Sequence, residues 1–304
     1  MKKRLLFCLL PICLLAACQS APPLPTQEKP LPKLKIGLAL GGGAAKGFAH
    51  IGVIKMLEAQ GIKPDVVSGT SAGSVVGVLY ASGLDAFALQ ERSFALDEAQ
   101  IRDVSLFSGG LVKGEKLQNF VNDLLHYRPL DKLGKPFAAV STELDTGRRV
   151  FFERGNSGQA VRASSSIPGV FEPVVINGKR YVDGGIVSPV PVDAAHELGA
   201  DFVIAVDISR KASDSEAKNL FGIVNQSIAI MGQKLGEQEL ARADVVIRPK
   251  VGKIGATDFD QKNVAILEGE KALLAALPEI RQKMLEKQKA LAEKQILMSS
   301  QAGK

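Results

Sequence analysis

IKPDVVSGTSAGSVVGVLYAS, residues 62–82, predicts a short buried strand, a sharp turn and a buried helix in direct succession. At the turn, Gly69-Thr70-Ser71-Ala72-Gly73 has the pattern G-x-S-x-G, which can present a serine hydroxyl between a strand and a helix. The two glycines relieve crowding where the chain reverses, and the helix that follows Ser71 favours negative charge at its start. The pattern therefore indicates a nucleophilic serine, and the alternative is a tight glycine turn with no chemical role.

A second strand and turn precede this stretch. Residues 34–40 are apolar apart from Lys35 and run into the glycine-rich segment 41–47, after which a helix is expected from about Phe48 to Gln60. Backbone N–H groups of such a turn can approach an anion closely, as an acyl-transfer enzyme requires where a carbonyl oxygen becomes negative. A nucleotide-phosphate loop is the competing interpretation. It is disfavoured because Lys46 stands where G-x-G-x-x-G counted from Gly41 needs glycine, and because Phe48 follows Gly47 where a P-loop needs Lys.

Four motifs in order resemble those of bacterial patatin-like phospholipases, and of a lipoprotein member in particular. They are GGGAAKGFAHIG at 41–52, GTSAG at 69–73, ASSSIPGVFEP at 163–173 and YVDGG at 181–185. The resemblance, with the flanking pattern, covers roughly residues 34–277. It implies a three-layer α/β/α domain with a mostly parallel central sheet, and hydrolysis of acyl esters by a Ser-Asp dyad.

By motif position, Ser71 is the expected nucleophile and Asp183 the expected base. The resemblance places the oxyanion hole at Gly41, Gly42, Gly43 and Ala44, and the residues that complete the motifs are Lys46, Gly47, Gly69, Gly73, Gly184 and Gly185. One residue departs from the family pattern: Ala44 replaces the third glycine of a hexamer laid on residues 42–47. Alanine still offers its N–H but restricts φ, so the geometry of the hole depends on the backbone at that position.

Serine needs a partner that accepts its proton, and the chain holds only three histidines, His50, His126 and His196. The order Ser71, Asp183, His196 fits a triad, but His196 falls on the apolar stripe of a helix and is expected to pack. His50 is expected to fix the helix after the glycine loop. Asp183 precedes two glycines and could equally form an Asp-Gly turn. A carboxylate is a weak base at an ordinary pKa, so the dyad requires a partly desolvated Asp183.

The N-terminal residues predict where in the cell the protein is located. Lys2, Lys3 and Arg4 precede a thirteen-residue apolar run, and Leu15-Ala16-Ala17-Cys18 resembles a bacterial lipoprotein signal. We expect a signal peptide at 1–17, a lipidated Cys18 and a proline-rich tether over 18–33. By resemblance to such lipoproteins, Gln19 after the cysteine implies sorting to the periplasmic face of the outer membrane in a bacterial cell envelope. An ordinary secretory signal is the alternative.

Charge and cysteine content limit the possible partners. The net charge of +6 comes from the two ends, since residues 1–17 and 278–304 each contribute +3 and leave the central chain neutral. The basic balance therefore predicts no nucleic-acid binding. All three cysteines precede residue 19, so the domain holds no disulfide or cysteine-zinc site. A basic helix over 278–304 could lie on anionic lipid, and packing on the domain or against a partner helix, as in a homo-oligomer, is favoured.

The rest of the chain reads as alternating strands and helices. Strands are expected at 137–141, 149–152, 174–176, 202–207 and 245–248, and helices at 159–165, 192–198, 219–241 and 264–277. Residues 84–136 instead predict consecutive amphipathic helices, either a mobile lid over the site or an ordinary helical layer.

These features together predict a lipid-anchored acyl hydrolase acting on phospholipid or lysophospholipid, with no cofactor and no metal. A general carboxylesterase or thioesterase is the alternative within enzymes. A non-catalytic patatin-like scaffold of the cell envelope is the alternative outside them.

Overall fold

The computed structural model describes residues 30–95, 112–209 and 220–302. Residues Pro32–Lys304 form one compact unit. The predicted signal peptide and Cys18 lie outside the described residues, as does the glycine-containing segment 108–110 of the predicted lid.

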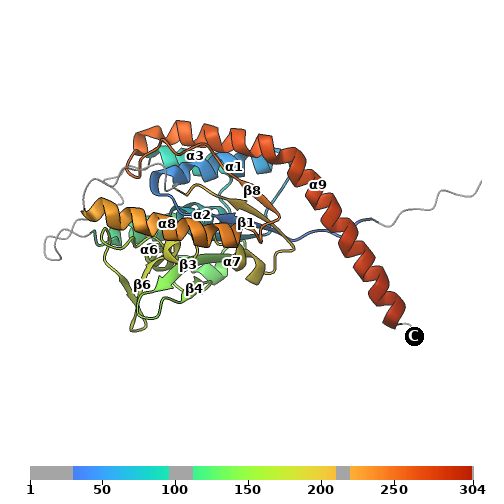
Figure 1. Cartoon of the computed structure of the whole chain (residues 1–304), viewed down its shortest axis with the longest axis horizontal. Coiled ribbons are helices and arrows are strands. Elements are labelled where there is room, and N and C mark those ends of the chain that lie inside the picture. The colour runs from blue at the N-terminus through green and yellow to red at the C-terminus, as the bar shows by residue number, and fades with distance from the viewer. Residues whose placement is uncertain (1–29, 96–111, 210–219, 303–304) are drawn as a thin grey trace, which may run out of the picture. The chain divides into compact units, whose positions relative to one another are not determined.

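A mixed sheet of eight strands forms the centre of the described part of the chain (Figure 1). The strands are β1 Ile36–Leu40, β2 Val66–Thr70, β3 Phe137–Glu143, β4 Arg149–Phe152, β5 Val174–Ile176, β6 Lys179–Asp183, β7 Phe202–Val206 and β8 Val245–Ile247. The order is β5-β6-β3-β2-β1-β7-β8, with β4 paired to β3 off this path. Neighbours from β3 to β8 along the path are parallel, and β4, β5 and β6 pair antiparallel. This confirms the predicted mostly parallel sheet.

Helices cover the sheet where the apolar periodicity predicts them. The α-helices are α1 Phe48–Ala59, α2 Ala72–Ala81, α3 Ala86–Ala95, α5 Glu115–Leu124, α6 Ser157–Ser164, α7 Val192–Glu197, α8 Leu220–Leu240 and α9 Lys262–Ala302, and the short 3-10 turns include η1 Ala44–Gly47 and η3 Gly184–Ile186. The described part of the predicted insertion 84–136 contains α3 and α5, so it is helical as expected.

The core forms two layers because successive side chains of a strand point to opposite faces. Ile36, Leu38 and Leu40 of β1 pack in one cluster with buried side chains of α1, α2 and α9. Ala39, which lies between them in sequence, packs in a second cluster with side chains of α7 and with Leu240 of α8. The sheet is therefore covered on both faces, as the predicted α/β/α arrangement requires.

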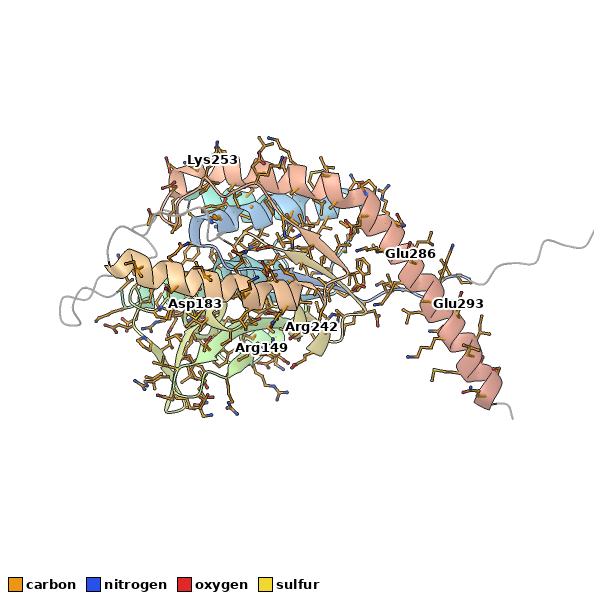
Figure 2. The ribbon with its side chains drawn as sticks, viewed as in Figure 1. Arg149, Asp183, Arg242, Lys253, Glu286 and Glu293 are labelled. Carbon is orange, nitrogen blue, oxygen red and sulfur yellow. The ribbon has the colours of Figure 1, made fainter. Side chains whose placement is uncertain are left out.

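An ion-pair cluster joins α8 to the sheet and to α7. Buried Glu239 accepts a hydrogen bond from the hydroxyl of Ser188 at 2.9 Å. Arg149 lies 2.8 Å from Asp193 and 3.2 Å from Glu239, and Arg242 also donates to Asp193. Figure 2 labels Arg149 and Arg242. Because a partly buried charge must be paired, the cluster fixes where α8 ends on the domain.

The last helix is longer than the sequence indicates. The predicted boundary between residues 277 and 278 falls inside α9, which is continuous through Pro278. Ile280 is fully buried, and Met284 and Leu291 pack against the main core. Glu286 and Glu293 lie farther along this helix (Figure 2), and the apolar side chains at 296–298 are exposed. In the described residues, none of the helices combines the length and hydropathy that crossing a membrane would need.

Candidate active site

The G-x-S-x-G segment forms the sharp turn that the sequence predicts. Ser71 lies between β2 and α2 with φ 53° and ψ −123°, a conformation that costs a non-glycine residue about 1–3 kcal/mol. A Cβ atom on Gly69 would lie 2.4 Å from the carbonyl oxygen of Gly73, and one on Gly73 would lie 2.1 Å from that of Leu40. Both positions therefore require glycine because backbone approaches backbone there.

Hydrogen bonds from neighbouring serines hold this strained turn. The N–H of Ser71 donates to the hydroxyl of Ser164 at 3.0 Å, and that hydroxyl donates to the carbonyl oxygen of Val140 at 2.6 Å. The carbonyl oxygen of Ser71 accepts from the hydroxyl of Ser74 at 2.7 Å. The elbow is thus tied both to β3 and to the first turn of α2.

Strand register brings Asp183 to Ser71. Thr70, the last residue of β2, is paired with Val140 of β3, and the next residue of β3, Ser141, is paired with Asp183 at the end of β6. Ser71 follows Thr70 directly. Two residues that are far apart in sequence therefore meet across one strand, and the side chain of Ser71 lies close enough to the Asp183 carboxyl group to lower its pKa.

The surroundings of Asp183 make its carboxylate a stronger base. Burial raises the pKa of Asp183 to about 6, although the nearby Ser71 side chain and the N–H of Gly185, which donates to Asp183 at 2.7 Å, lower it. The residue is only 6% exposed. A carboxylate whose pKa lies near 6 accepts a proton near neutral pH more readily than an ordinary aspartate. The desolvation that the predicted dyad requires is therefore present.

The glycine loop holds fewer available donors than the sequence predicts. The N–H of Gly41 donates to Val206 and that of Gly42 to Pro189, each to a carbonyl oxygen at 3.0 Å. These two amides anchor the loop, which corrects the expectation that they belong to the oxyanion hole. The N–H groups of Gly43 and Ala44 donate to no acceptor within the described residues. Ala44 has φ 51°, a left-handed conformation that glycine would adopt at lower cost.

The remaining motif residues support this geometry. Gly47 brings η1 against α2, because a Cβ atom there would lie 2.8 Å from that of Ala72. Lys46 is buried beside it. Gly184 lies close to β3, where an added Cβ would be 2.2 Å from the carbonyl oxygen of Val140, and Gly185 donates to Asp183.

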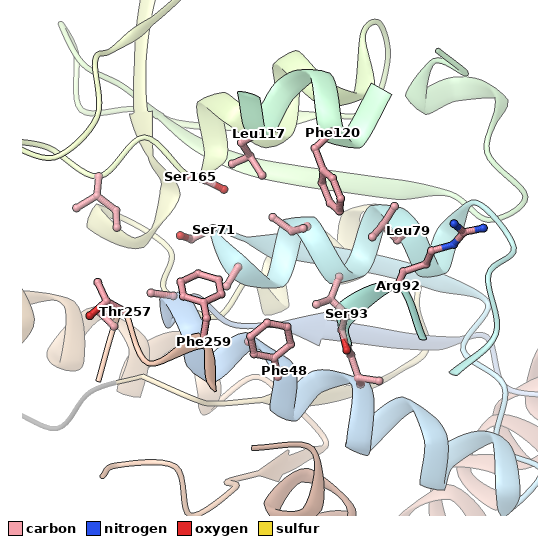
Figure 3. A pocket seen from close by; sticks show the side chains of 18 of the residues that line it. Phe48, Ser71, Leu79, Arg92, Ser93, Leu117, Phe120, Ser165, Thr257 and Phe259 are labelled. Carbon is pink, nitrogen blue, oxygen red and sulfur yellow. The ribbon is translucent and has the colours of Figure 1, made fainter. Parts of the chain in front are cut away.

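An apolar cavity of about 360 Å³ adjoins Ser71. It follows α2 from Ser71 to Leu79, and Figure 3 shows Phe48, Phe120 and Phe259 around it. Polar lining groups include Ser165 beside Ser71, and Arg92 and Ser93 at the other end in this view. Helices α3 and α5 both contribute side chains, so the predicted insertion forms part of the cavity wall. Whether it moves as a lid stays a prediction.

Comparison with known proteins agrees with this arrangement. The sequence profile of the family described as patatin-like phospholipase matches residues 38–196, which include the glycine loop, Ser71 and Asp183. The chain belongs to the patatin-like phospholipase family.

Relatives of this patatin-like domain occur in larger proteins. An uncharacterized NTE family protein of Mycobacterium tuberculosis is 38% identical over 177 residues, which are 58% of this chain and 49% of that protein. Lysophospholipase NTE1 of Coccidioides immitis is 34% identical over 185 residues, 57% of this chain and 11% of that protein. The matches thus cover about half or less of these relatives. The crystal structure of VipD from Legionella pneumophila has a TM-score of 0.59 at 15% identity, over 81% of this chain and 67% of that one, and shares the fold.

His196 does not form a triad with Ser71 and Asp183. The ring nitrogens of His196 lie 3.3 Å and 3.2 Å from the carbonyl oxygens of Ala200 and Arg242. Ala200 precedes β7, whereas Ser71 follows β2, and these strands run parallel through β1. His196 therefore lies at the opposite edge of the sheet from Ser71.

His50 supports the glycine loop. Its Nε2 atom donates to the carbonyl oxygen of Gly41 at 2.8 Å. Burial lowers the pKa of His50 to about 4, so the imidazole is neutral at physiological pH. Its Nδ1 atom has no hydrogen-bond partner among the residues that the structure describes. His50 therefore holds the glycine loop in place, in addition to the following helix that the sequence predicts it to fix.

Sequence analysis missed two site residues of the patatin-like domain. Ser164 supports the Ser71 amide, and Ser165 lines the cavity. Both belong to the run of three serines at 164–166 within the third motif. The run was the available signal, but nothing in it distinguishes a hydroxyl that faces the site from one that closes a helix.

In the described ranges, no group of three His, Cys, Asp or Glu side chains is placed to hold a metal ion.

Proposed function

We propose that this chain is a serine acyl hydrolase that cleaves the carboxylic ester of a phospholipid or lysophospholipid. The observation that carries the proposal is that strand register brings buried Asp183, whose pKa burial raises, to the side chain of Ser71 at one end of an apolar cavity. Membership of the patatin-like phospholipase family and the resemblance to a fungal lysophospholipase support it.

In the proposed mechanism, Asp183 accepts the proton of the Ser71 hydroxyl as Oγ attacks the ester carbon. The carbonyl oxygen becomes negative and is stabilised by the N–H groups of Gly43 and Ala44. The tetrahedral intermediate then releases the alcohol, which takes the proton from Asp183, and leaves an acyl group on Ser71. Water attacks this acyl-enzyme as Asp183 again accepts a proton. The bond between the acyl carbon and Ser71 Oγ then breaks, Asp183 returns the proton to Oγ, and the free fatty acid leaves.

The shape of the cavity supports a substrate with an acyl chain. Ser71 and Leu79 are eight residues apart on α2, which corresponds to about 12 Å along the helix axis. The lining side chains along this path are predominantly apolar, and a hydrocarbon chain would bury its surface against them. A lipid with one acyl chain beside Ser71 and a polar head group outside the cavity fits this arrangement.

We also propose that the protein is held at the bacterial cell envelope by a lipid on Cys18, on the periplasmic face of the outer membrane. The support is the sequence pattern of residues 1–19 alone. The proline-rich segment up to residue 33 would act as the tether between lipid and domain.

The test is covalent labelling followed by a lipid panel. The purified full chain is incubated with a fluorophosphonate, and the modified peptide is identified by mass spectrometry. We expect one adduct, on Ser71, and no adduct in Ser71→Ala. A folded wild-type protein that stays unlabelled would overturn the hydrolase proposal and favour a non-catalytic scaffold.

Product analysis then separates the alternatives within enzymes. Phospholipids, lysophospholipids, simple carboxylic esters and acyl thioesters are offered at equal concentration, below and above the point at which the lipids form aggregates. We expect the highest kcat/KM for an aggregated lipid ester. Equal rates for soluble simple esters would favour a general carboxylesterase or thioesterase.

A further inference from the structure

Ser165 carries a buried hydroxyl on a residue that lines the cavity. The residue is 8% exposed, and its Oγ atom has no hydrogen-bond partner in the part of the chain that the structure describes. Its two neighbours differ: Ser164 donates to the carbonyl oxygen of Val140 at 2.6 Å, and Ser166 donates to that of Arg162 at 2.8 Å. Buried hydroxyls are nearly always paired, so an unpaired one that lines a cavity indicates a ligand that pairs with it.

The position of Ser165 indicates which atom of the ligand would pair with its hydroxyl. In Figure 3, Ser165 lies beside Ser71 at the same end of the cavity. The adjacent residue, Ser166, accepts a hydrogen bond from the N–H of Asp183 at 2.8 Å. Ser165 therefore lies on the side of the cavity where Asp183, the proposed base, is located.

The oxyanion donors lie on the other side of Ser71. Strand β2, which leads to Ser71, has β3 and then β6 on one side and β1 on the other. The glycine loop follows β1, whereas Asp183 ends β6. A tetrahedral ester carbon on Ser71 would direct its negative oxygen to the loop and its acyl chain along α2. Its alkoxy oxygen is then left on the side of Asp183 and Ser165.

We propose that the Ser165 hydroxyl donates a hydrogen bond to the alkoxy oxygen of the ester and so positions the leaving group. The inference rests on the proposed acyl hydrolase function. The Ser165 hydroxyl keeps its proton: the bond between the ester carbon and the alkoxy oxygen breaks, and the proton that this oxygen gains comes from Asp183. Ser165 stabilises the charge that grows on the leaving oxygen before that transfer.

Two esters with the same acyl chain and different leaving groups test this role. A lysophospholipid releases an alkoxide of glycerol, which is strongly basic and needs assistance, whereas a p-nitrophenyl ester releases a stable phenolate. For Ser165→Ala we expect kcat/KM to fall about ten- to hundred-fold for the lysophospholipid. For the p-nitrophenyl ester we expect a fall of less than about threefold. A purely structural role would lower both values together.

Control variants distinguish loss of the Ser165 hydroxyl from a general change in the cavity wall. Ser93→Ala removes another serine that lines the same cavity, but its hydroxyl already donates to the carbonyl oxygen of Gln90 at 2.7 Å. It should leave the ratio of the two kcat/KM values unchanged. Ser165→Thr keeps a hydroxyl and should restore lysophospholipid hydrolysis in part. Ser165→Ala should also have an unchanged or higher melting temperature, because it removes a buried group without a partner.

The possible results are distinguishable. If Ser165→Ala lowers kcat/KM equally for both esters, or for neither, Ser165 does not position the leaving group, and the proposed hydrolase function is unaffected. Failure of the wild-type protein to hydrolyse either ester would overturn the proposed function and this inference with it. A selective loss on the lysophospholipid, restored by threonine, would support the inference.

Discussion

The backbone N–H of Ser71 donates to the hydroxyl of Ser164, 3.0 Å away, and through that hydroxyl the elbow is joined to β3. The same strand pairs with Asp183. A single side chain therefore links the strained backbone of the proposed nucleophile to the strand that pairs with its proposed base.

Replacing Ser164 should weaken the elbow. Ser164→Ala leaves the buried Ser71 N–H and one carbonyl oxygen without this partner, so we expect the free energy of unfolding to fall by about 1–3 kcal/mol. Urea unfolding measures this change. Ser82→Ala is the matched control, because the Ser82 hydroxyl donates only to the carbonyl oxygen of Leu79 at a helix end. Equal stability of the two variants would contradict a special role for Ser164.

Activity should depend on the ionisation of Asp183. The pKa of this carboxyl group is raised to about 6 by burial, and only its ionised form can accept the proton of Ser71. We expect kcat/KM to rise about tenfold per pH unit below pH 6 and to level off above it. Hydrolysis of a soluble ester between pH 4.5 and 8.5 measures the profile. An inflection near pH 4, or a value that falls as pH rises through 6, would contradict this assignment.

Asp183→Asn should stabilise the protein while abolishing hydrolysis. In the unfolded chain Asp183 has its ordinary pKa of 3.8, whereas in the folded chain its pKa is about 6. Between these values only the unfolded state loses the proton, so wild-type stability falls as pH rises and the penalty is complete above pH 6. Two pKa units correspond to about 3 kcal/mol, and imperfect pairing of the new amide lowers the expected gain to about 1–3 kcal/mol at pH 8.

Denaturant unfolding at pH 8 and pH 4 tests whether the gain in the free energy of unfolding has this pH dependence. The advantage of Asp183→Asn should be present at pH 8 and nearly absent at pH 4. Asp145→Asn is the control: Asp145 is exposed and pairs with Arg180, and that pairing lowers its pKa, so no gain at pH 8 is expected. A gain that is equal at both pH values would show that burial of the charge is not its cause.

Ala44→Gly should relieve backbone strain in the glycine loop. Alanine at φ 51° costs about 1–2 kcal/mol, and the greater freedom of glycine in the unfolded chain offsets about half of the relief. We expect a gain of up to about 1 kcal/mol, with kcat/KM within about threefold of wild type because the N–H is retained. Ala59→Gly, at the end of α1, should instead destabilise by up to about 1 kcal/mol.

Filling the cavity should shorten the preferred acyl chain. Val75 is four residues from Ser71 on α2, about 6 Å along the helix, and its side chain lines the cavity. Val75→Phe should preserve hydrolysis of acetyl and butyryl esters and lower kcat/KM for long-chain esters at least about tenfold. Competition between p-nitrophenyl esters of increasing chain length measures the ratio. An unchanged chain-length profile would show that the chain does not follow α2.

Several features were predictable because they depend on neighbouring residues. The period of apolar residues predicts β1, α1 and the strand-turn-helix around Ser71, and close backbone contacts explain why Gly69 and Gly73 are glycines. Helix α9 was only partly predicted. Its apolar residues are widely spaced beyond residue 277, and only tertiary contact shows that Ile280 is buried.

The sequence by itself therefore determined the elements, their alternation and the candidate chemical groups, because local periodicity and motif order encode them. Tertiary structure decided which groups meet. Pairing of Val140 with Thr70 and of Ser141 with Asp183 places the base beside Ser71, and that register is a contact between distant segments. It also decided that the amides of Gly41 and Gly42 are occupied, and that the Ser165 hydroxyl has no hydrogen-bond partner among the described residues. A hydrogen-bond partner from elsewhere in the chain cannot be inferred from a motif, because only the folded packing brings it within reach.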